Sequence, residues 1–229
     1  MSKILIETVN LSKTYNHLNG NITLFNNLNL KVKKGDLVAL VGPSGSGKSS
    51  LLHLLALLDE PTKGDIKINE VFTKKFLDEK KDEIRRKNIS IIFQDNNLLN
   101  DFTTIENVMM PLIIKGEKEE IAKKEAQKIL RAVKIFDRSQ HFPNELSGGE
   151  QQRVAIARAL ISKTNLILAD EPTGNLDYQT AKEIFSYFLK LKKLKKTIIF
   201  ATHNREFANR ADYKLFISNG DIKRVNARK

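Results

Sequence analysis

Residues 42–49 read Gly42-Pro43-Ser44-Gly45-Ser46-Gly47-Lys48-Ser49, which fits the pattern GxxxxGK[ST]. An apolar run at residues 37–41 precedes this stretch, and an apolar helical pattern at residues 50–58 follows it. The order predicts a buried strand, a glycine loop and a helix. The four fixed positions recur by chance in about one unrelated chain of this length in a hundred. The flanking strand and helix make a chance match rarer still.

The glycine loop has the chemistry of a phosphate site. Its glycines have no Cβ, so the backbone can turn sharply and point its N–H groups at phosphate oxygens, at the positive end of the following helix. Lys48 is a point charge that can reach the β- and γ-phosphates of a nucleotide, and the Ser49 hydroxyl is a hard oxygen ligand for Mg²⁺. We therefore expect the loop and the start of the helix, through Ser50, to bind a nucleotide with its Mg²⁺.

Composition limits the class of protein. The chain has 229 residues, 41% hydrophobic and 29% charged, which suits one sizeable soluble domain or two closely joined ones. We find no apolar run of the 18 or more residues that a membrane-spanning helix needs, and no signal-peptide pattern, so we expect a cytosolic chain. The absence of cysteine excludes disulfides and thiolate metal sites.

The net charge of +12 has two interpretations. The basic clusters at residues 85–87, 123–124 and 190–196 could face an acidic partner, either nucleic acid or an anionic membrane. They could instead be an ordinary solvated surface. We favour the second interpretation and expect no nucleic-acid partner, because the clusters are scattered and lack the interleaved aromatic residues on which bases stack.

The hydrophobic pattern predicts an α/β domain with a helical insert between residues 95 and 163. Strands are predicted at residues 4–9, 28–32, 37–41, 66–68, 89–93, 166–169 and 197–201. Helices are predicted at residues 50–58, 80–87, 104–114, 118–133, 151–160 and 180–194.

Polar residues follow three of the predicted strands, at the sheet edge where ligands of α/β proteins collect. Gln94 could contact Mg²⁺ or an attacking water, although an ordinary loop glutamine is an equally good interpretation. Asp170 and Glu171 end a buried strand; the first can hold Mg²⁺ through water, and the second can orient and polarise the attacking water. His203 could donate a hydrogen bond to a γ-phosphate. Together these residues suit metal-assisted hydrolysis of a nucleotide.

A second phosphate-ready site is predicted where Ser147, Gly148, Gly149 and Glu150 precede a helical run. The alternative is an ordinary helix N-cap, in which Ser147 and Glu150 form a capping box of the type S-x-x-E. The two functions can coexist.

Two further features stay open from the residues alone. Tyr15 stands next to residues 16–21, which look like a polar loop, and a lone loop tyrosine is most often a packing residue. Leu98, Leu99 and Phe102 are apolar residues in a polar linker, where they form either local core or an exposed docking patch.

In combination these motifs resemble the ATP-binding cassette (ABC) ATPases over nearly the whole chain. The family's ordered elements correspond to the glycine loop as Walker A, Gln94 as the Q-loop, LSGGE at residues 146–150 as the signature, LILADE at residues 166–171 as Walker B, NLD at residues 175–177 as the D-loop, and His203 as the switch histidine. Glu150 stands where many members carry glutamine, although both occur in the family.

The resemblance implies a P-loop NTPase fold with a RecA-like core, an antiparallel β subdomain and a helical subdomain. Residues 1–94 and 164–229 would form the core with the β subdomain, and residues 95–163 the helical subdomain. It also implies a head-to-tail homodimer with two sandwiched ATP molecules, each bound by the Walker A of one subunit and by Ser147 and Gly149 of the other. Tyr15 would stack on adenine, and Asp177 would belong to the shared site.

Within the family, the run QQRVAIARAL at residues 151–160 looks like a transporter subunit. DEPTGNLD at residues 170–177 resembles the branch that contains lipoprotein-releasing, macrolide-exporting and cell-division ATPases, and LLHLL at residues 51–55 is most similar to the lipoprotein-releasing group. This implies a peripheral protein on the cytoplasmic face of a bacterial inner membrane, bound to LolC- and LolE-like permeases whose coupling helices meet Leu98, Leu99 and Phe102. A macrolide or peptide exporter, a division ATPase and a soluble ABC ATPase remain alternatives, and a P-loop kinase is disfavoured by LSGGE.

Overall fold

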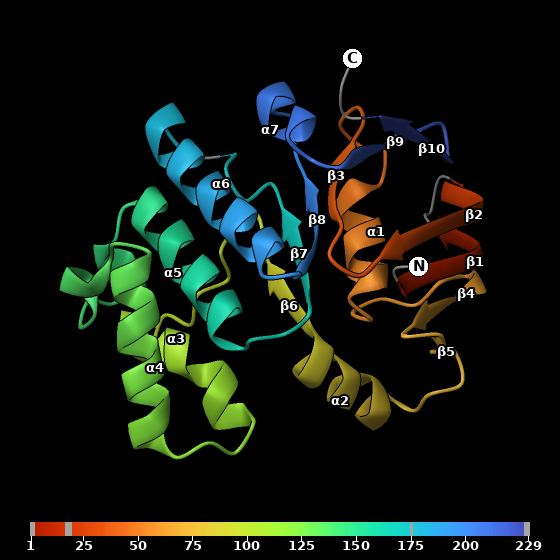
Figure 1. The fold of residues 1–229 in the computed structure, drawn as a ribbon. Helices are drawn as coiled ribbons and strands as arrows, with labels where there is room; N and C mark the ends of the chain where they lie inside the picture. The colour runs from red at the N-terminus through yellow and green to blue at the C-terminus, as the bar shows by residue number, and fades with distance from the viewer. Residues whose placement is uncertain (1–2, 17–19, 175, 227–229) are drawn as a thin grey trace.

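The computed structural model describes residues 3–16, 20–174 and 176–226, which form two sheets and a helical part (Figure 1). The four-stranded sheet has the order β2-β1-β4-β5 and is antiparallel throughout. The six-stranded sheet has the order β10-β9-β3-β8-β7-β6, and only its edge strand β10 is antiparallel to its neighbour. The strands are β1 (Ile4–Tyr15), β2 (Ile22–Lys33), β3 (Leu37–Val41), β4 (Lys63–Ile68), β5 (Val71–Phe72), β6 (Ile89–Ile92), β7 (Leu166–Asp170), β8 (Thr197–Ala201), β9 (Tyr213–Ser218) and β10 (Asp221–Asn226).

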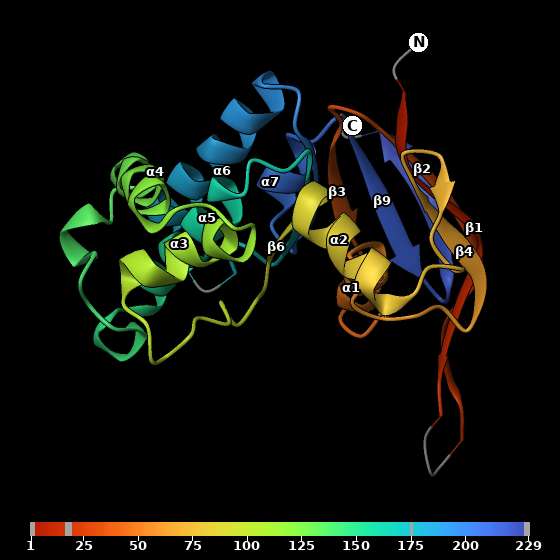
Figure 2. The same cartoon turned by 90° about the horizontal axis from the view of Figure 1, so that it is seen from below.

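The helices cover both faces of the six-stranded sheet. Helix α1 lies between this sheet and the four-stranded one, while α6 and the helical part, α3 to α5, lie on the other side (Figures 1 and 2). The helices are α1 (Lys48–Leu55), α2 (Asp78–Asn88), α3 (Thr104–Ile114), α4 (Glu119–Ala132), α5 (Gly148–Ile161), α6 (Tyr178–Lys193) and α7 (Arg205–Asn209), with short 3-10 turns at Phe136–Arg138 and Pro143–Glu145.

The central strands are apolar throughout because their two faces pack against two different hydrophobic cores. In β3, Leu37 and Ala39 pack toward the core under α3 to α6, whereas Val38 and Leu40 pack toward the core around α1. Alternate residues of a strand point to opposite faces, and a strand covered on both faces therefore reads as a continuous apolar run. This burial fixes the carboxyl ends of the parallel strands at one edge of the sheet.

The predicted fold class is confirmed, with differences at the ends of elements. Tyr15 is the last residue of a long first strand and does not lie in a loop; the prediction ended this strand too early because Asn10, at φ +49°, and register shifts interrupt its alternation. Part of the predicted polar loop, residues 17–19, lies outside the described residues. No element was predicted beyond residue 203, where the structure has α7, β9 and β10.

Phe185 of α6 packs between β8 and α7, and its replacement should lower the stability of the fold. Its ring stacks on Phe207 at 4.7 Å between centroids and packs edge-on against Phe200 at 5.4 Å. Since Phe185 is fully buried, Phe185→Ala is expected to lower the free energy of unfolding by about 3–5 kcal/mol in urea denaturation. The exposed Phe216 is the control, and Phe216→Ala should cost about 1 kcal/mol or less. Equal losses would show that the cluster does not join these elements.

Candidate active site

A cavity of about 660 Å³ opens at the carboxyl ends of β3, β6, β7 and β8, a size within the usual range of ligand sites. It brings together residues predicted from separate motifs: Lys48, Ser49, Gln94, Glu171 and His203. Its other lining residues are Ser44, Gly45, Thr173, Gly174, Leu176, Tyr178, Ala181, Thr202 and Asn204. Among the described residues, five members of the predicted loop site shape the loop and helix start without lining this cavity: Gly42, Pro43, Ser46, Gly47 and Ser50.

The glycine loop requires glycine at two positions where the chain passes close to its neighbours. Gly47 precedes α1 with φ +91°, and a Cβ there would lie 2.7 Å from Cζ of Phe25. Gly42 has φ +156°, and a Cβ there would lie 2.3 Å from the carbonyl oxygen of Ile217. Because glycine alone tolerates both the φ and the approach, the loop can wrap back over the N-terminus of α1.

Lys48 extends its side chain back across this loop. Its ammonium donates to the carbonyl oxygens of Gly42 and Pro43, at 3.1 Å each, and the residue is only 7% exposed. Within residues 3–16, 20–174 and 176–226, these two carbonyl oxygens are the acceptors that the Lys48 ammonium contacts. A buried cation with only neutral acceptors provides a strong attraction for a phosphate anion.

Glu171 and His203 meet across the ends of β7 and β8. Nε2 of His203 lies 3.0 Å from Oε1 of Glu171, and the glutamate side chain is much the more buried of the two. Glu171 has φ +45°, a left-handed backbone conformation that costs about 1–3 kcal/mol for a residue other than glycine. Hydrogen bonds from its N–H to Ala201 and from the N–H of Gly174 to its carbonyl hold this conformation. The strained turn fixes a carboxylate in the wall of the cavity.

Asp170 fits the role of a metal ligand. It ends β7 with 7% exposure, and its Oδ1 is buried without a hydrogen-bond partner among the described residues. A buried carboxylate oxygen is costly unless it is paired, hydrogen-bonded or coordinated to a metal. Mg²⁺ takes one or two protein oxygens together with phosphate oxygens and water. Among the described residues, no group of three or more His, Cys, Asp or Glu side chains is placed to hold a metal ion.

The predicted second phosphate site lies on a different cavity. This one, of about 350 Å³, is lined by Ser147, Gly149, Glu150, Arg153, Leu176, Asp177 and Thr180. The capping box is present, since Ser147 accepts from the N–H of Glu150 and the Glu150 carboxylate accepts from the N–H of Ser147. The hydrogen bond from the Ser147 backbone lowers the pKa of Glu150, which also pairs with Arg138 at 3.1 Å. The signature glycines therefore stand at a charged, ordered helix start.

Asp177 is the N-cap of α6. Its carboxylate accepts from the N–H of Thr180 at 3.0 Å, and hydrogen bonds from Thr180 lower its pKa. It lines the signature cavity and not the cavity at the strand ends. Asn175, the first residue of the predicted D-loop, lies outside the described residues.

Three predicted contact residues divide between core and surface. Leu98 packs against the core, so the core interpretation holds for it, whereas Leu99 and Phe102 are exposed. Tyr15 is also partly exposed and is not among the residues that line the strand-end cavity.

Several lining residues were missed from the sequence. Thr202 and Asn204 flank the predicted His203, and Thr173 and Gly174 lie within the motif that follows Glu171, so proximity to a predicted site residue was the available signal. Tyr178 directly follows the predicted Asp177, so the same signal was available for it. It lines the cavity because α6 begins beside it, and its hydroxyl donates to Glu206 at 2.9 Å.

Comparison with known proteins agrees with this geometry. The family model described as ABC transporter matches residues 25–174. The chain therefore belongs to the ABC transporter family and carries its nucleotide-binding ATPase domain. Among curated relatives, the lipoprotein-releasing system ATP-binding protein LolD of Rickettsia bellii is 47% identical, covering 94% of this chain and 96% of its own. The protein of the same name from Legionella pneumophila is 40% identical, covering 97% and 98%.

The fold of the chain is also similar to those of solved ABC cassettes. A bacterial ABC transporter cassette solved as a dimer superposes with a TM-score of 0.94 at 37% identity, covering 98% of this chain and all of that one. A dimeric cassette in a post-hydrolysis state, bound to ADP and phosphate, gives a TM-score of 0.94 at 36% identity. The predicted resemblance to ABC ATPases is thus confirmed.

Proposed function

We propose that this chain is the ATP-hydrolysing subunit of an ABC transporter that releases lipoproteins from the inner membrane for sorting to the outer membrane. The observation that carries the ATPase assignment is the convergence of Lys48, Ser49, Gln94, Glu171 and His203 on one cavity. The lipoprotein-releasing assignment is supported by relatives named LolD that match this chain over nearly its whole length.

In this proposal the residues that line the cavity, together with Asp170 beside it, have separate roles in hydrolysis. The loop N–H groups and Lys48 bind the phosphates. Ser49 and Asp170 would hold Mg²⁺, with Gln94 beside them, and the bound cation would supply positive charge next to the phosphates. Glu171 accepts the proton of the attacking water, and His203 donates a hydrogen bond to the γ-phosphate.

The same proposal assigns the parts of the chain. Residues 1–94 and 164–229 form the ATP-binding core with its β subdomain, and residues 95–163 form the helical subdomain that carries the signature. The packing of α3, α4 and α5 on one another supports this division.

A second copy of the chain completes each ATP site in this account. Within one chain the signature residues line a cavity other than the one that holds Lys48 and Glu171. A head-to-tail dimer would bring the Ser147 and Gly149 of one copy to the nucleotide of the other. The solved dimers of similar cassettes support this arrangement.

Gly148→Arg tests the dimer. A Cβ at Gly148 would meet nothing within 4 Å, so arginine fits the monomer and leaves the capping box in place. In a Glu171→Gln background, which retains ATP, we expect Gly148→Arg to abolish the ATP-dependent dimer in size-exclusion chromatography. The control is Ala132→Arg, an equal substitution at an exposed helical position. An ATP-dependent dimer of Gly148→Arg would place the signature outside the interface.

The permease is the second partner in the proposal. None of the helices in the described ranges is long and apolar enough to cross a membrane. We assign the chain to the cytoplasmic face of the inner membrane, where exposed Leu99 and Phe102 would contact LolC- and LolE-like subunits.

A pull-down from native membranes tests this partner. Tagged Glu171→Gln with ATP should recover two permeases of that kind together with a lipoprotein, and omission of ATP is the control. Recovery of a single efflux permease or of a division protein would be consistent with the ATPase assignment but would contradict lipoprotein as the substrate. Recovery of no membrane protein would overturn the transporter assignment.

A further inference from the structure

Asp59 lies in the segment that follows α1 and is hydrogen-bonded to the end of β1. Its Oδ1 accepts a hydrogen bond from Nζ of Lys13 at 2.6 Å, and its Oδ2 accepts one from the hydroxyl of Tyr15 at 2.9 Å. The two donors lie two positions apart on β1, and the acceptor lies more than forty residues further along the chain. One carboxylate therefore fixes two side chains of a different element.

Lys13 is held firmly in this arrangement. It is buried, and its ammonium also donates to the carbonyl oxygen of Glu60 at 2.8 Å. Burial alone would raise the pKa of Asp59, but hydrogen bonds from Lys13, Tyr15 and the N–H of Glu60 outweigh it and lower that pKa. The carboxylate stays ionised at neutral pH and pairs with a cation that has little access to water.

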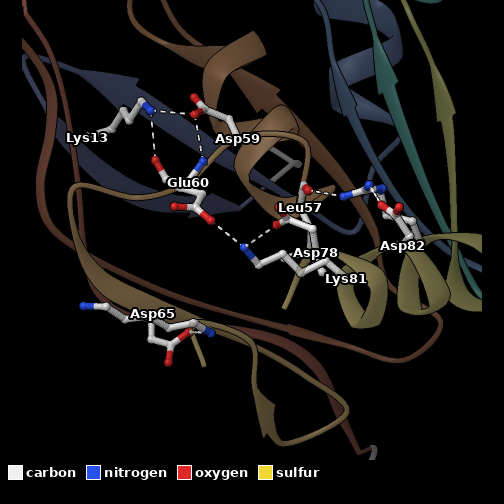
Figure 3. A network of polar contacts seen from close by, with 10 residues as sticks. Lys13, Leu57, Asp59, Glu60, Asp65, Asp78, Lys81 and Asp82 are labelled. Carbon is white, nitrogen blue, oxygen red and sulfur yellow. Dashed lines mark hydrogen bonds and ion pairs between the residues drawn. The ribbon is translucent and has the colours of Figure 1, made fainter. Parts of the chain in front are cut away.

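The segment that carries Asp59 is itself fastened to α2, as Figure 3 shows. The Glu60 carboxylate pairs with Lys81, and Arg85 donates to the carbonyl oxygen of Leu57. Lys81 and Arg85 belong to α2, which leads directly into β6 and Gln94. These contacts with α2 hold the segment of Asp59 in place, so the Asp59 carboxylate can act as a fixed acceptor that orients the Tyr15 side chain.

The consequence for Tyr15 is a ring fixed in two ways. Its hydroxyl is tied to Asp59, and the ammonium of Lys13 lies over one face, 4.6 Å from the ring centroid. The residue nevertheless remains 41% exposed. Because Lys13 covers one face of the ring, a flat aromatic ligand would have to stack on the other face.

We propose that Asp59, together with Lys13, is a positioning residue that presents the free face of Tyr15 to the purine base of the bound nucleotide. This inference rests on the proposed function, since it assumes that the bound nucleotide is ATP and that its base meets Tyr15. In this inference Asp59 and Lys13 raise the affinity for the base without contacting the phosphates.

The test separates the base from the phosphates. In the Glu171→Gln background, dissociation constants are measured for ATP and for inorganic triphosphate, the latter by competition. Tyr15→Phe keeps the ring and removes its tie to Asp59, and we expect it to weaken ATP binding about fivefold, part of the full value of a base–aromatic stack. Triphosphate binding should be unchanged. Asp59→Ala should have the same effect, and the double variant should lose no more than either single one.

Controls separate positioning from stability. Glu7→Gln removes another carboxylate that pairs with lysines of the same sheet, Lys31 and Lys67, and should leave both constants unchanged. Asp59→Ala leaves the buried Lys13 without its carboxylate partner and could prevent folding. In that case the test depends on Tyr15→Phe alone, because this variant keeps the ion pair of Lys13 and Asp59. Wild-type ATP affinity in Tyr15→Phe, or additive losses in the double variant, would overturn the inference. Failure of the parent variant to bind ATP would overturn the proposed function as well.

Discussion

Glu171→Gln is expected to bind ATP as the unaltered chain does and to hydrolyse it at least about 100-fold more slowly. A positioned general base contributes about 10²–10⁴-fold to rate, and an amide at the same place cannot accept the proton of the attacking water. Glutamine keeps the size of the side chain and an oxygen for the hydrogen bond with His203, so the cavity should keep its shape. Steady-state phosphate release and equilibrium ATP binding measure the two effects separately.

The control for this substitution is Glu125→Gln. Glu125 pairs with Lys128 and Lys163 on the surface of the helical part, and its replacement should leave turnover unchanged. Turnover near normal in Glu171→Gln would move the base to another residue.

Lys48→Ala is expected to weaken ATP binding by about 10- to 150-fold. Hydrogen bonds to charged groups contribute about 1.5–3 kcal/mol, and Lys48 is the buried cation at the loop, 3.1 Å from each of two carbonyl oxygens that a phosphate would outcompete. The rate of ATP hydrolysis at low ATP concentration should fall by at least the same factor. Titration calorimetry of ATP with Mg²⁺ measures the affinity.

Lys128→Ala is the matched control, because that lysine is exposed and pairs only with the surface carboxylate of Glu125 within the described residues. A melting temperature close to that of the parent would show that Lys48→Ala is folded. Unchanged ATP affinity in a folded Lys48→Ala would remove Lys48 from the phosphate site.

The sequence predicted the parts of this protein that depend on local pattern. The strand before the glycine loop could be recognised because both of its faces are buried, which leaves an unbroken apolar run at Leu37–Val41. The helix start at Ser147 could be recognised because a capping box has a fixed spacing. Residues at the ends of parallel strands could be grouped because those ends share one sheet edge, and the cavity contains Gln94, Glu171 and His203.

The remaining features depend on contacts between distant segments. Nothing near Tyr15 in the sequence points to Asp59, and nothing near Glu171 predicts its left-handed backbone or its contact with His203. Tyr178 lines the cavity only because α6 is packed against the sheet through Phe185. The division of the two predicted phosphate sites between separate cavities likewise follows from the folded chain, since the motifs alone carry no distances.

Release of a labelled lipoprotein from proteoliposomes measures the proposed function itself. The chain is reconstituted with the permeases that copurify with it, and the lipoprotein that leaves the membrane is counted after ATP and Mg²⁺ are added. We expect ATP-dependent release with the unaltered chain and almost none with Glu171→Gln. Equal release by the two, or vigorous ATP hydrolysis by the unaltered chain without release, would contradict it.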